Sequence, residues 1–259
     1  NIASRLDAQG RPIPLIAETG GMNAMIVDSS ALTEQVVIDV LASAFDSAGQ
    51  RCSALRVLCL QDEIADHTLK MLRGAMAECR MGNPGRLTTD IGPVIDSEAK
   101  VNIERHIQTM RSKGRPVFQA VRENSEDARE WQSGTFVAPT LIELDDFAEL
   151  QKEVFGPVLH VVRYNRNQLP ELIEQINASG YGLTLGVHTR IDETIAQVTG
   201  SAHVGNLYVN RNMVGAVVGV QPFGGEGLSG TGPKAGGPLY LYRLLANRPE
   251  SALAVTLAR

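Results

Sequence analysis

Apolar positions recur along this chain in two periods, and the alternation between the two periods predicts its architecture. Apolar residues fall at helical spacing over 33–45, 62–79, 97–113, 169–176, 191–198 and 239–245. Short apolar runs that predict strands lie at 25–27, 55–60, 117–121, 136–144, 158–162, 183–188, 205–209 and 252–257. Helices and strands that alternate at this pace predict an α/β fold with an open, mostly parallel sheet flanked by helices.

Two features interrupt this pattern. Pro139 falls inside one of the predicted strands, which predicts an edge strand or a bulge there. Between 219 and 237, eight of nineteen residues are glycine, so we expect a loop that bends sharply or approaches another group closely. This loop contains a G-x-G-x-x-G pattern at 225–230. A dinucleotide-binding fingerprint follows a strand and opens a helix, and Pro222 and Pro233 on its two flanks argue against that assignment.

The composition is that of an ordinary globular protein and removes several classes of function. Of 259 residues, 43% are hydrophobic and 20% are charged, and the formal net charge is -5. Lysine and arginine form no long block, so nucleic-acid binding is not expected. No apolar run approaches the roughly 18 residues that a membrane span needs. The three cysteines form no CxxC pair and no cluster with histidine, which favours a reducing, cytoplasmic setting and predicts no metal site.

One cysteine differs from the other two in its surroundings. Cys52 follows Gly49 and two polar residues, between a predicted helix and a predicted strand, so we expect it on a turn. Cys59 lies in an apolar run and Cys79 ends an amphipathic helix, which favours packing roles for both. Glu18 precedes two glycines and can project from a turn as a carboxylate partner. These residues alone leave Cys52 open between a reactive thiol and an ordinary cysteine, and Glu18 open between a base and a solvated carboxylate.

Five short motifs carry more information together than any one of them does alone. They are Glu18-Thr19-Gly20-Gly21-Met22-Asn23, Gly49-Gln50-Arg51-Cys52, Glu153-Val154-Phe155-Gly156-Pro157, the segment 206–210 and Pro222-Phe223-Gly224-Gly225. In this order they resemble the aldehyde dehydrogenase superfamily, and the resemblance covers nearly the whole chain. It implies an aldehyde dehydrogenase catalytic domain, with the preceding Rossmann-type domain largely missing.

The resemblance also implies how the chain is divided. Residues 1–19 match the C-terminal remnant of an NAD-binding domain, 20–224 the catalytic domain, and 225–259 a Gly-rich crossover, a helix and a possible oligomerisation strand. The chain opens without an initiator methionine, so we expect a piece of a longer polypeptide. Members of the family form dimers, so the resemblance implies a homo-oligomer, namely a dimer. Because most of the cofactor domain and an oxyanion-hole asparagine belong upstream, we expect the isolated chain to be inactive or nearly so.

The motifs imply a two-stage reaction on a cysteine. By resemblance, Cys52 attacks the aldehyde as a thiolate, and Glu18 later activates the water that hydrolyses the resulting thioester. The implied cofactor is NAD, and the positions that match its contacts are Glu153, Phe155, Thr19 and Gly20. The positions that match contacts with the substrate are Ser53, Gly215, Ala216 and Phe223.

Two details resemble one branch of the superfamily more than the others. Ser53 directly follows the cysteine, and Gly215-Ala216 precedes the Gly-rich loop, as in enzymes that oxidise L-glutamate γ-semialdehyde, the open form of Δ1-pyrroline-5-carboxylate. The stretch 223–234 is similar to bacterial bifunctional enzymes of proline breakdown, in which a flavin-dependent proline dehydrogenase comes first. FAD is therefore expected only in such an upstream domain, and peripheral membrane association only for the longer protein.

Two alternatives stay open. The first is a dehydrogenase of another semialdehyde, such as succinate semialdehyde, although Ser53 and the Gly215-Ala216 pair weigh against it. The second is a non-catalytic domain that serves oligomerisation or binding, although the presence of both Cys52 and Glu18 weighs against that. A panel of substrates separates the first alternative from the favoured one, and comparison of thiol labelling at Cys52 and Cys59 tests the second.

Overall fold

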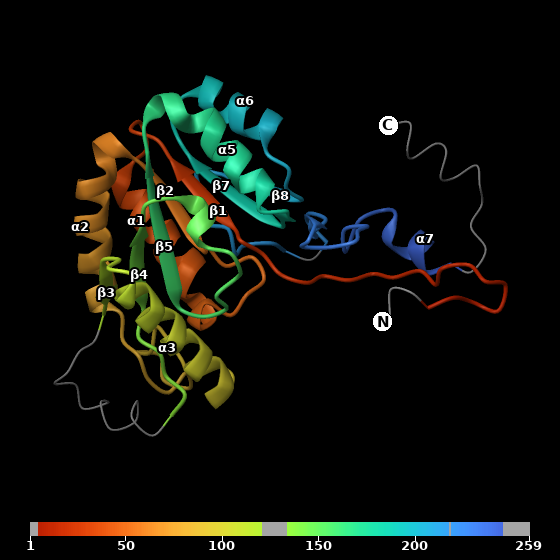
Figure 1. Cartoon of the computed structure of the whole chain (residues 1–259), viewed down its shortest axis with the longest axis horizontal. Helices are drawn as coiled ribbons and strands as arrows, with labels where there is room; N and C mark the ends of the chain where they lie inside the picture. Colours follow the sequence, from red (N-terminus) through yellow and green to blue (C-terminus); the bar gives the residue numbers. More distant parts are fainter. Residues whose placement is uncertain (1–4, 121–133, 218, 246–259) are drawn as a thin grey trace.

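A largely parallel sheet forms the centre of the molecule (Figure 1). The computed structural model describes residues 5–120, 134–217 and 219–245. Within these residues, seven strands lie in the order β3-β4-β5-β2-β1-β7-β8, and every pair is parallel except β3 and β4. The strands are β1 (Ala24–Val27), β2 (Val57–Gln61), β3 (Val117–Gln119), β4 (Thr140–Leu144), β5 (Val158–Tyr164), β7 (Thr184–His188) and β8 (Asn206–Val209). A separate antiparallel pair joins β6 (Tyr181–Gly182) to β9 (Glu226–Gly227).

Helices pack around this sheet (Figure 1). They are α1 (Thr33–Phe45), α2 (Asp62–Glu78), α3 (Ser97–Ser112), α5 (Leu169–Ala178) and α6 (Asp192–Ser201). The short α7 (Tyr240–Leu244) lies away from the sheet (Figure 1). The spacing of apolar residues explains how they pack, because residues three and four apart share one face of a helix. On α1, for example, Val36, Val40 and Ala44 are completely buried.

The central strands are buried on both faces. Every residue of β1 and of β2 is buried, including Ile26 and Leu58, which have no exposed surface. A parallel strand that is covered on both sides reads as a continuous apolar run rather than an alternating one. This is why the strands could be recognised in the sequence, and the predicted α/β architecture is confirmed.

One prediction about the sheet was wrong. The run at 136–144 was expected to form an edge strand or a bulge because of Pro139. The structure starts β4 at Thr140, after the proline, and places β4 between β3 and β5. The backbone N–H of Thr140 donates to the carbonyl of Pro157 at 2.9 Å, so the proline precedes the ladder and removes no donor from it.

The first and last described segments run side by side, away from the sheet (Figure 1). The backbone N–H of Thr231 donates to the carbonyl of Ala17 at 3.0 Å, and Nη2 of Arg243 donates to the carbonyl of Leu15 at 3.4 Å. The predicted strand at 252–257 lies outside the described residues. In the part of the chain that the structure describes, no helix is both long and apolar enough to cross a membrane.

Candidate active site

A left-handed turn carries Cys52, as the sequence predicted a turn here. Residues 47–49 have φ values of 55°, 53° and 65°. Left-handed backbone costs a residue other than glycine about 1–2 kcal/mol, so this turn needs support from its surroundings. A Cβ on Gly49 would lie 2.2 Å from the carbonyl oxygen of Gly156, which leaves room for glycine alone. We call residues 46–53 the Cys52 turn; the thiol of Cys52 is free and exposed.

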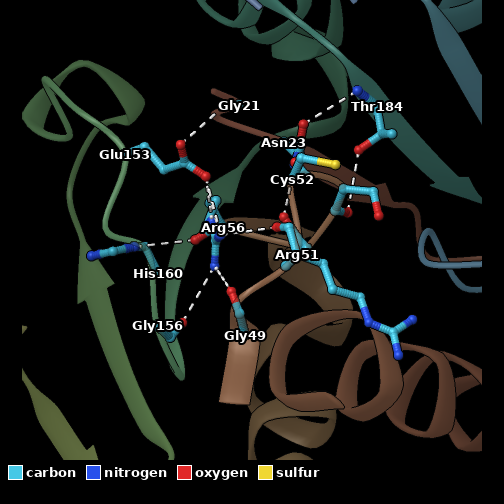
Figure 2. Close-up of polar contacts among 12 residues, drawn as sticks. Gly21, Asn23, Gly49, Arg51, Cys52, Arg56, Glu153, Gly156, His160 and Thr184 are labelled. Atoms are coloured by element: carbon cyan, nitrogen blue, oxygen red, sulfur yellow. Dashed lines mark hydrogen bonds and ion pairs between the residues drawn. The ribbon is translucent and has the colours of Figure 1, made fainter. Parts of the chain in front are cut away.

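A buried asparagine fixes this turn to the sheet. Asn23, which is 2% exposed, comes directly before β1. Its Nδ2 donates to the carbonyl oxygens of Cys52 (2.7 Å) and Ala54 (2.8 Å). Its Oδ1 accepts from the backbone N–H of Thr184 at 3.2 Å (Figure 2). Because both N–H donors and the oxygen are engaged, one side chain ties the Cys52 turn to β1 and β7.

The guanidinium of Arg56 lies fully buried behind the same turn (Figure 2). It donates to the carbonyl oxygens of Gly49 (2.7 Å), Arg51 (3.2 Å) and Gly156 (3.3 Å). Its Nε and Nη2 also donate to Oε1 of Glu153, at 3.2 Å and 3.0 Å. Burial lowers the pKa of Arg56, and the carboxylate of Glu153 opposes that shift. Arg56 and Glu153 therefore form a buried ion pair between the Cys52 turn and the segment before β5.

The second oxygen of Glu153 faces the motif that contains Glu18. Oε2 accepts from the backbone N–H of Gly21 at 3.2 Å (Figure 2). The approach is close, because a Cβ on Gly20 would lie 2.8 Å from the same oxygen. The predicted cofactor residues Glu153 and Gly20 are thus neighbours, and both belong to one connected site.

Phe155 forms part of the wall of a pocket of about 510 Å³ beside the ion pair. Its ring lies 5.0 Å from Cζ of Arg56, a cation–π contact, and the residue is 45% exposed. Residues of α3 also line this pocket. Gln50 also lines the pocket, and its Oε1 accepts from the backbone N–H of Ile95 at 2.8 Å. The volume lies within the usual range for ligand pockets.

The carboxylate of Glu18 lies against the Gly-rich loop. The backbone N–H of Gly225 donates to its Oε2 at 3.3 Å, and the N–H of Thr19 donates to the carbonyl of Ser229 at 3.1 Å. Both Glu18 and Thr19 are exposed. Among the residues that the structure describes, no hydrogen bond joins Glu18 to Cys52, so the two predicted catalytic side chains belong to neighbouring segments without direct pairing.

Three of the predicted substrate positions lie in the Cys52 turn or beside it. Ser53 is buried and directly follows the cysteine. Nη1 of Arg51 donates to the carbonyl of Val214 at 3.4 Å, which brings the loop with Gly215 and Ala216 next to the turn. The structure therefore assembles these positions from segments that are far apart in the sequence.

The fourth predicted substrate position, Phe223, is held by a different set of contacts. Its backbone pairs with that of Ala235, at 3.0 Å and 2.7 Å. Asn206, the first residue of β8, donates from Nδ2 to the carbonyl of Pro222 (2.9 Å) and accepts at Oδ1 from the N–H of Gly224 (3.1 Å). Its predicted packing on a substrate chain stays a prediction.

The three cysteines differ in exposure, as their sequence contexts predicted. Cys52 is exposed, Cys79 is partly buried and Cys59 is buried in β2. Burial raises the pKa of the Cys59 thiol to about 12. Cys59 therefore stays protonated near neutral pH, where only a thiolate is a strong nucleophile.

The sequence alone does not indicate the roles of two residues of this site. Asn23 appeared within a motif, but its binding of the Cys52 turn was not foreseen. Arg56 lies within an apolar run that predicts a strand, and the run itself assigns it no role. A single arginine inside such a run is nevertheless a signal, because a cation in a buried strand must find partners.

This fold and these motifs define the class of protein. The model of the aldehyde dehydrogenase family matches residues 1–246, and the chain belongs to this family. The bifunctional protein PutA of Escherichia coli (strain K12) is 99% identical over all 259 residues of this chain, which spans 20% of that relative's length. The 1-pyrroline-5-carboxylate dehydrogenase of Geobacillus kaustophilus (strain HTA426) is 36% identical over 229 residues, 88% of this chain and 43% of that protein.

Solved structures have the same fold. A crystal structure of bifunctional proline utilization A (PutA) has a TM-score of 0.85 and 52% identity, over 93% of this chain and 24% of that one. A 1-pyrroline-5-carboxylate dehydrogenase from Thermus, crystallised with bound NAD, has a TM-score of 0.78 and 36% identity, over 88% of this chain and 43% of that one.

Proposed function

We propose that this chain supplies the catalytic domain of an NAD-dependent dehydrogenase that oxidises L-glutamate γ-semialdehyde to glutamate, the second step of proline breakdown. The observation that carries the proposal is the exposed thiol of Cys52 on a braced turn beside the pocket lined by Glu153 and Phe155. A 1-pyrroline-5-carboxylate dehydrogenase is 36% identical to this chain over 88% of the chain's length, which supports this substrate. Glutamate γ-semialdehyde is the open form of 1-pyrroline-5-carboxylate.

Cys52 is the proposed nucleophile. Its thiolate forms a bond to the aldehyde carbon, and the aldehyde oxygen takes up the negative charge of a thiohemiacetal. Loss of hydride from that carbon restores the carbonyl and leaves a thioester on the sulfur. Asn23 and Arg56 hold the turn from two sides, so the sulfur approaches the carbon in a fixed geometry.

NAD, when bound, supplies the acceptor for that hydride. We assign its binding in this chain to Glu153 and Phe155, with Thr19 and Gly20 from the facing motif. The residues fit such a ligand, because Phe155 offers an exposed ring face and the adjoining pocket has a volume of about 510 Å³. A carboxylate such as Glu153 can accept hydrogen bonds from ribose hydroxyls on its remaining lone pairs.

Glu18 is the proposed general base for the second stage. It takes a proton from water while the water oxygen attacks the thioester carbon. The carbon–sulfur bond then breaks, glutamate leaves and the thiolate of Cys52 returns. A positioned base of this kind contributes roughly 10²–10⁴-fold to a rate.

The carboxylate of the substrate is assigned to the end of the Cys52 turn and to the loop beside it. Ser53 offers a hydroxyl, and Gly215 and Ala216 offer backbone N–H groups from the loop that Arg51 holds. Phe223 is assigned to the aliphatic part of the substrate. Neutral donors of this kind bind a carboxylate and still allow the product to leave.

The experiment is a substrate panel on a full-length protein that carries this sequence. We expect kcat/KM for glutamate γ-semialdehyde to exceed that for succinate semialdehyde by at least about tenfold, with NADH formation as the readout. The Cys52→Ala variant should lose aldehyde oxidation while it still binds NAD. A preference for succinate semialdehyde would reassign the substrate, and substantial turnover by Cys52→Ala would remove the proposed nucleophile.

Three wider assignments belong to the longer protein. The relatives named bifunctional support an additional upstream proline dehydrogenase, which would hold FAD. An exposed reactive thiol fits a reducing compartment such as the cytoplasm. We also propose a homodimer, which light scattering of the purified full-length protein would measure directly.

A further inference from the structure

We propose that Arg56 is a positioning residue: paired with Glu153, its guanidinium holds the Cys52 turn and the cofactor-facing segment 153–156 in one fixed arrangement. This inference rests on the proposed function, since the turn and the segment matter because one carries the nucleophile and the other faces the cofactor. Glu153 is the one side chain to which Arg56 donates in these hydrogen bonds, and its other acceptors are backbone carbonyls.

The hydrogen bonds of Arg56 use the full capacity of its side chain. A guanidinium has five N–H donors in a rigid, planar fork. Here two donate to Glu153 and the others to the carbonyls of Gly49, Arg51 and Gly156. No other side chain could serve all of these acceptors, because lysine has three donors and lacks the fork.

Stability alone does not account for an arginine at this position. Arg56 has no exposed surface, and its neighbours Leu55 and Val57 are equally buried. Removal of a cation from water is costly, and buried ion pairs are often matched or exceeded in stability by apolar residues. An apolar side chain would continue the strand but could not hold the carbonyls of the turn.

The acceptors of Arg56 lie where the backbone is under strain. The left-handed residues 47–49 precede Cys52, and Arg56 binds the carbonyls of Gly49 and Arg51, on both sides of Gln50. Gln50 in turn contacts the loop at Pro93, through a bond of 3.3 Å from its Nε2. These bonds oppose relaxation of the turn, so they fix the point from which the cysteine projects.

Glu153 must be a carboxylate for this arrangement to hold. Its Oε1 faces donors of Arg56, and its Oε2 faces the N–H donor of Gly21. An amide has one acceptor oxygen and one donor nitrogen, so glutamine would set a donor against a donor on one of the two sides. The pair therefore links three segments: the motif of Glu18, the Cys52 turn and the segment before β5.

The first test compares Arg56→Lys with Arg163→Lys in a full-length protein that carries this sequence. Arg163 is a matched control, because it also pairs with a glutamate, Glu143, at 3.2 Å, but on the outer part of β5. We expect Arg56→Lys to lower kcat by about ten- to a hundredfold, while KM for the aldehyde stays within about twofold. Arg163→Lys should change neither constant. Rates are expressed per folded protein, as judged by circular dichroism and thermal unfolding.

The second test removes the link from its other end and needs neither cofactor nor substrate. Glu153→Gln is compared with the matched control Glu143→Gln by amide hydrogen exchange of the cofactor-free protein. We expect exchange in the peptide that covers residues 47–55 to accelerate by about tenfold in Glu153→Gln, and not in the control. A glutamate that only contacts the cofactor would leave this turn unchanged.

The outcomes separate this proposal from the proposed function. If folded Arg56→Lys keeps the wild-type kcat, or if Glu153→Gln leaves exchange at 47–55 unchanged, the positioning role is overturned. Should Arg56→Lys not fold, Glu153→Gln decides alone. A substrate panel that favours another aldehyde would change the proposed function but not the result of either comparison, because the kinetic comparison uses whichever aldehyde the enzyme oxidises and the exchange comparison uses none.

Discussion

Cys52 and Cys59 carry the same thiol and meet opposite environments. One projects from a strained turn into solvent, and the other lies inside β2, where burial raises its pKa to about 12. Exposure and backbone conformation, rather than residue type, thus decide which of them is available for chemistry. The same reasoning applies to Glu18, because a carboxylate can act as a general base only where a water molecule reaches it.

Substitution of Glu18 by glutamine should separate the two stages of the proposed reaction. Glutamine cannot take a proton from water, so thioester hydrolysis should slow by roughly 10²–10⁴-fold, while thiohemiacetal formation and hydride loss continue. A pre-steady-state experiment with excess substrate should show an undiminished burst of NADH followed by a slow steady state. Loss of the burst together with the steady rate would contradict the assignment of Glu18 to hydrolysis.

The sequence predicts which residues carry reactive groups, but it did not indicate the residues that hold them in place. Cys52 and Glu18 stand in short motifs that keep their order along the chain. Arg56 and Asn23 act on backbone carbonyls, which every residue possesses, so no pattern of side chains marks their partners. Only folding brings Gly156 to Arg56 and Thr184 to Asn23.

At the level of helices and strands, local sequence decides most of the structure. Buried parallel strands give continuous apolar runs, and helices packed on the sheet give apolar residues at helical spacing on one face, so both kinds of element can be recognised in the sequence. The role of β4 depended instead on a long-range pairing. Pro139 indicates only that a strand is disfavoured at its own position. Whether β4 is an edge strand is decided by β3, which pairs with β4 and comes from an earlier part of the chain.

The histidine within β5 predicts a local dependence on pH. His160 is fully buried; its ring contacts His106 at 2.8 Å and the carbonyl of Arg56 at 3.1 Å. Burial lowers its pKa from 6.5 to about 3. Between these values an opened β5 binds a proton that the folded strand does not, so stability is lost as pH falls below 6.5. Hydrogen exchange of β2 and β5, corrected for intrinsic rates, should show weaker protection at pH 5 than at pH 7.

A variant that cannot titrate provides the check. His160→Gln should show a smaller loss of protection between those two pH values, whereas His67→Gln, at an exposed position on α2, should behave as wild type. His106, whose pKa burial also lowers, contributes in the same direction and remains in both variants. An equal loss in wild type and His160→Gln would show that His160 is not the group responsible.

For the whole molecule, the site is assembled at one edge of the sheet. Asn23 precedes β1, Cys52 and Arg56 precede β2, and Glu153 and Gly156 precede β5. Residues before parallel strands meet at the amino edge, so this placement follows from the topology once the strand order is known. The strand order itself, in which β2 lies between β5 and β1, was not available from periodicity.

The isolated chain should show negligible oxidation of glutamate γ-semialdehyde. It spans 43% of the length of a 1-pyrroline-5-carboxylate dehydrogenase relative and 20% of PutA, and the family resemblance implies that most of the cofactor-binding domain belongs to the longer protein. Steady-state assays of the folded chain, beside a full-length protein as positive control, measure this. A turnover number near that of the full-length protein would refute it.

The edge of the sheet at which Cys52 lies also decides where a linker or label can be attached to this protein without covering the thiol. The turn comes before β2, and α2 begins directly after β2. The five residues of β2 lie between the two, and their extended length is roughly 16 Å. A surface tether, a fluorescent reporter or an electrode linker at the exposed start of α2 would leave the thiol edge open to solvent, so immobilised enzyme should keep its substrates within reach.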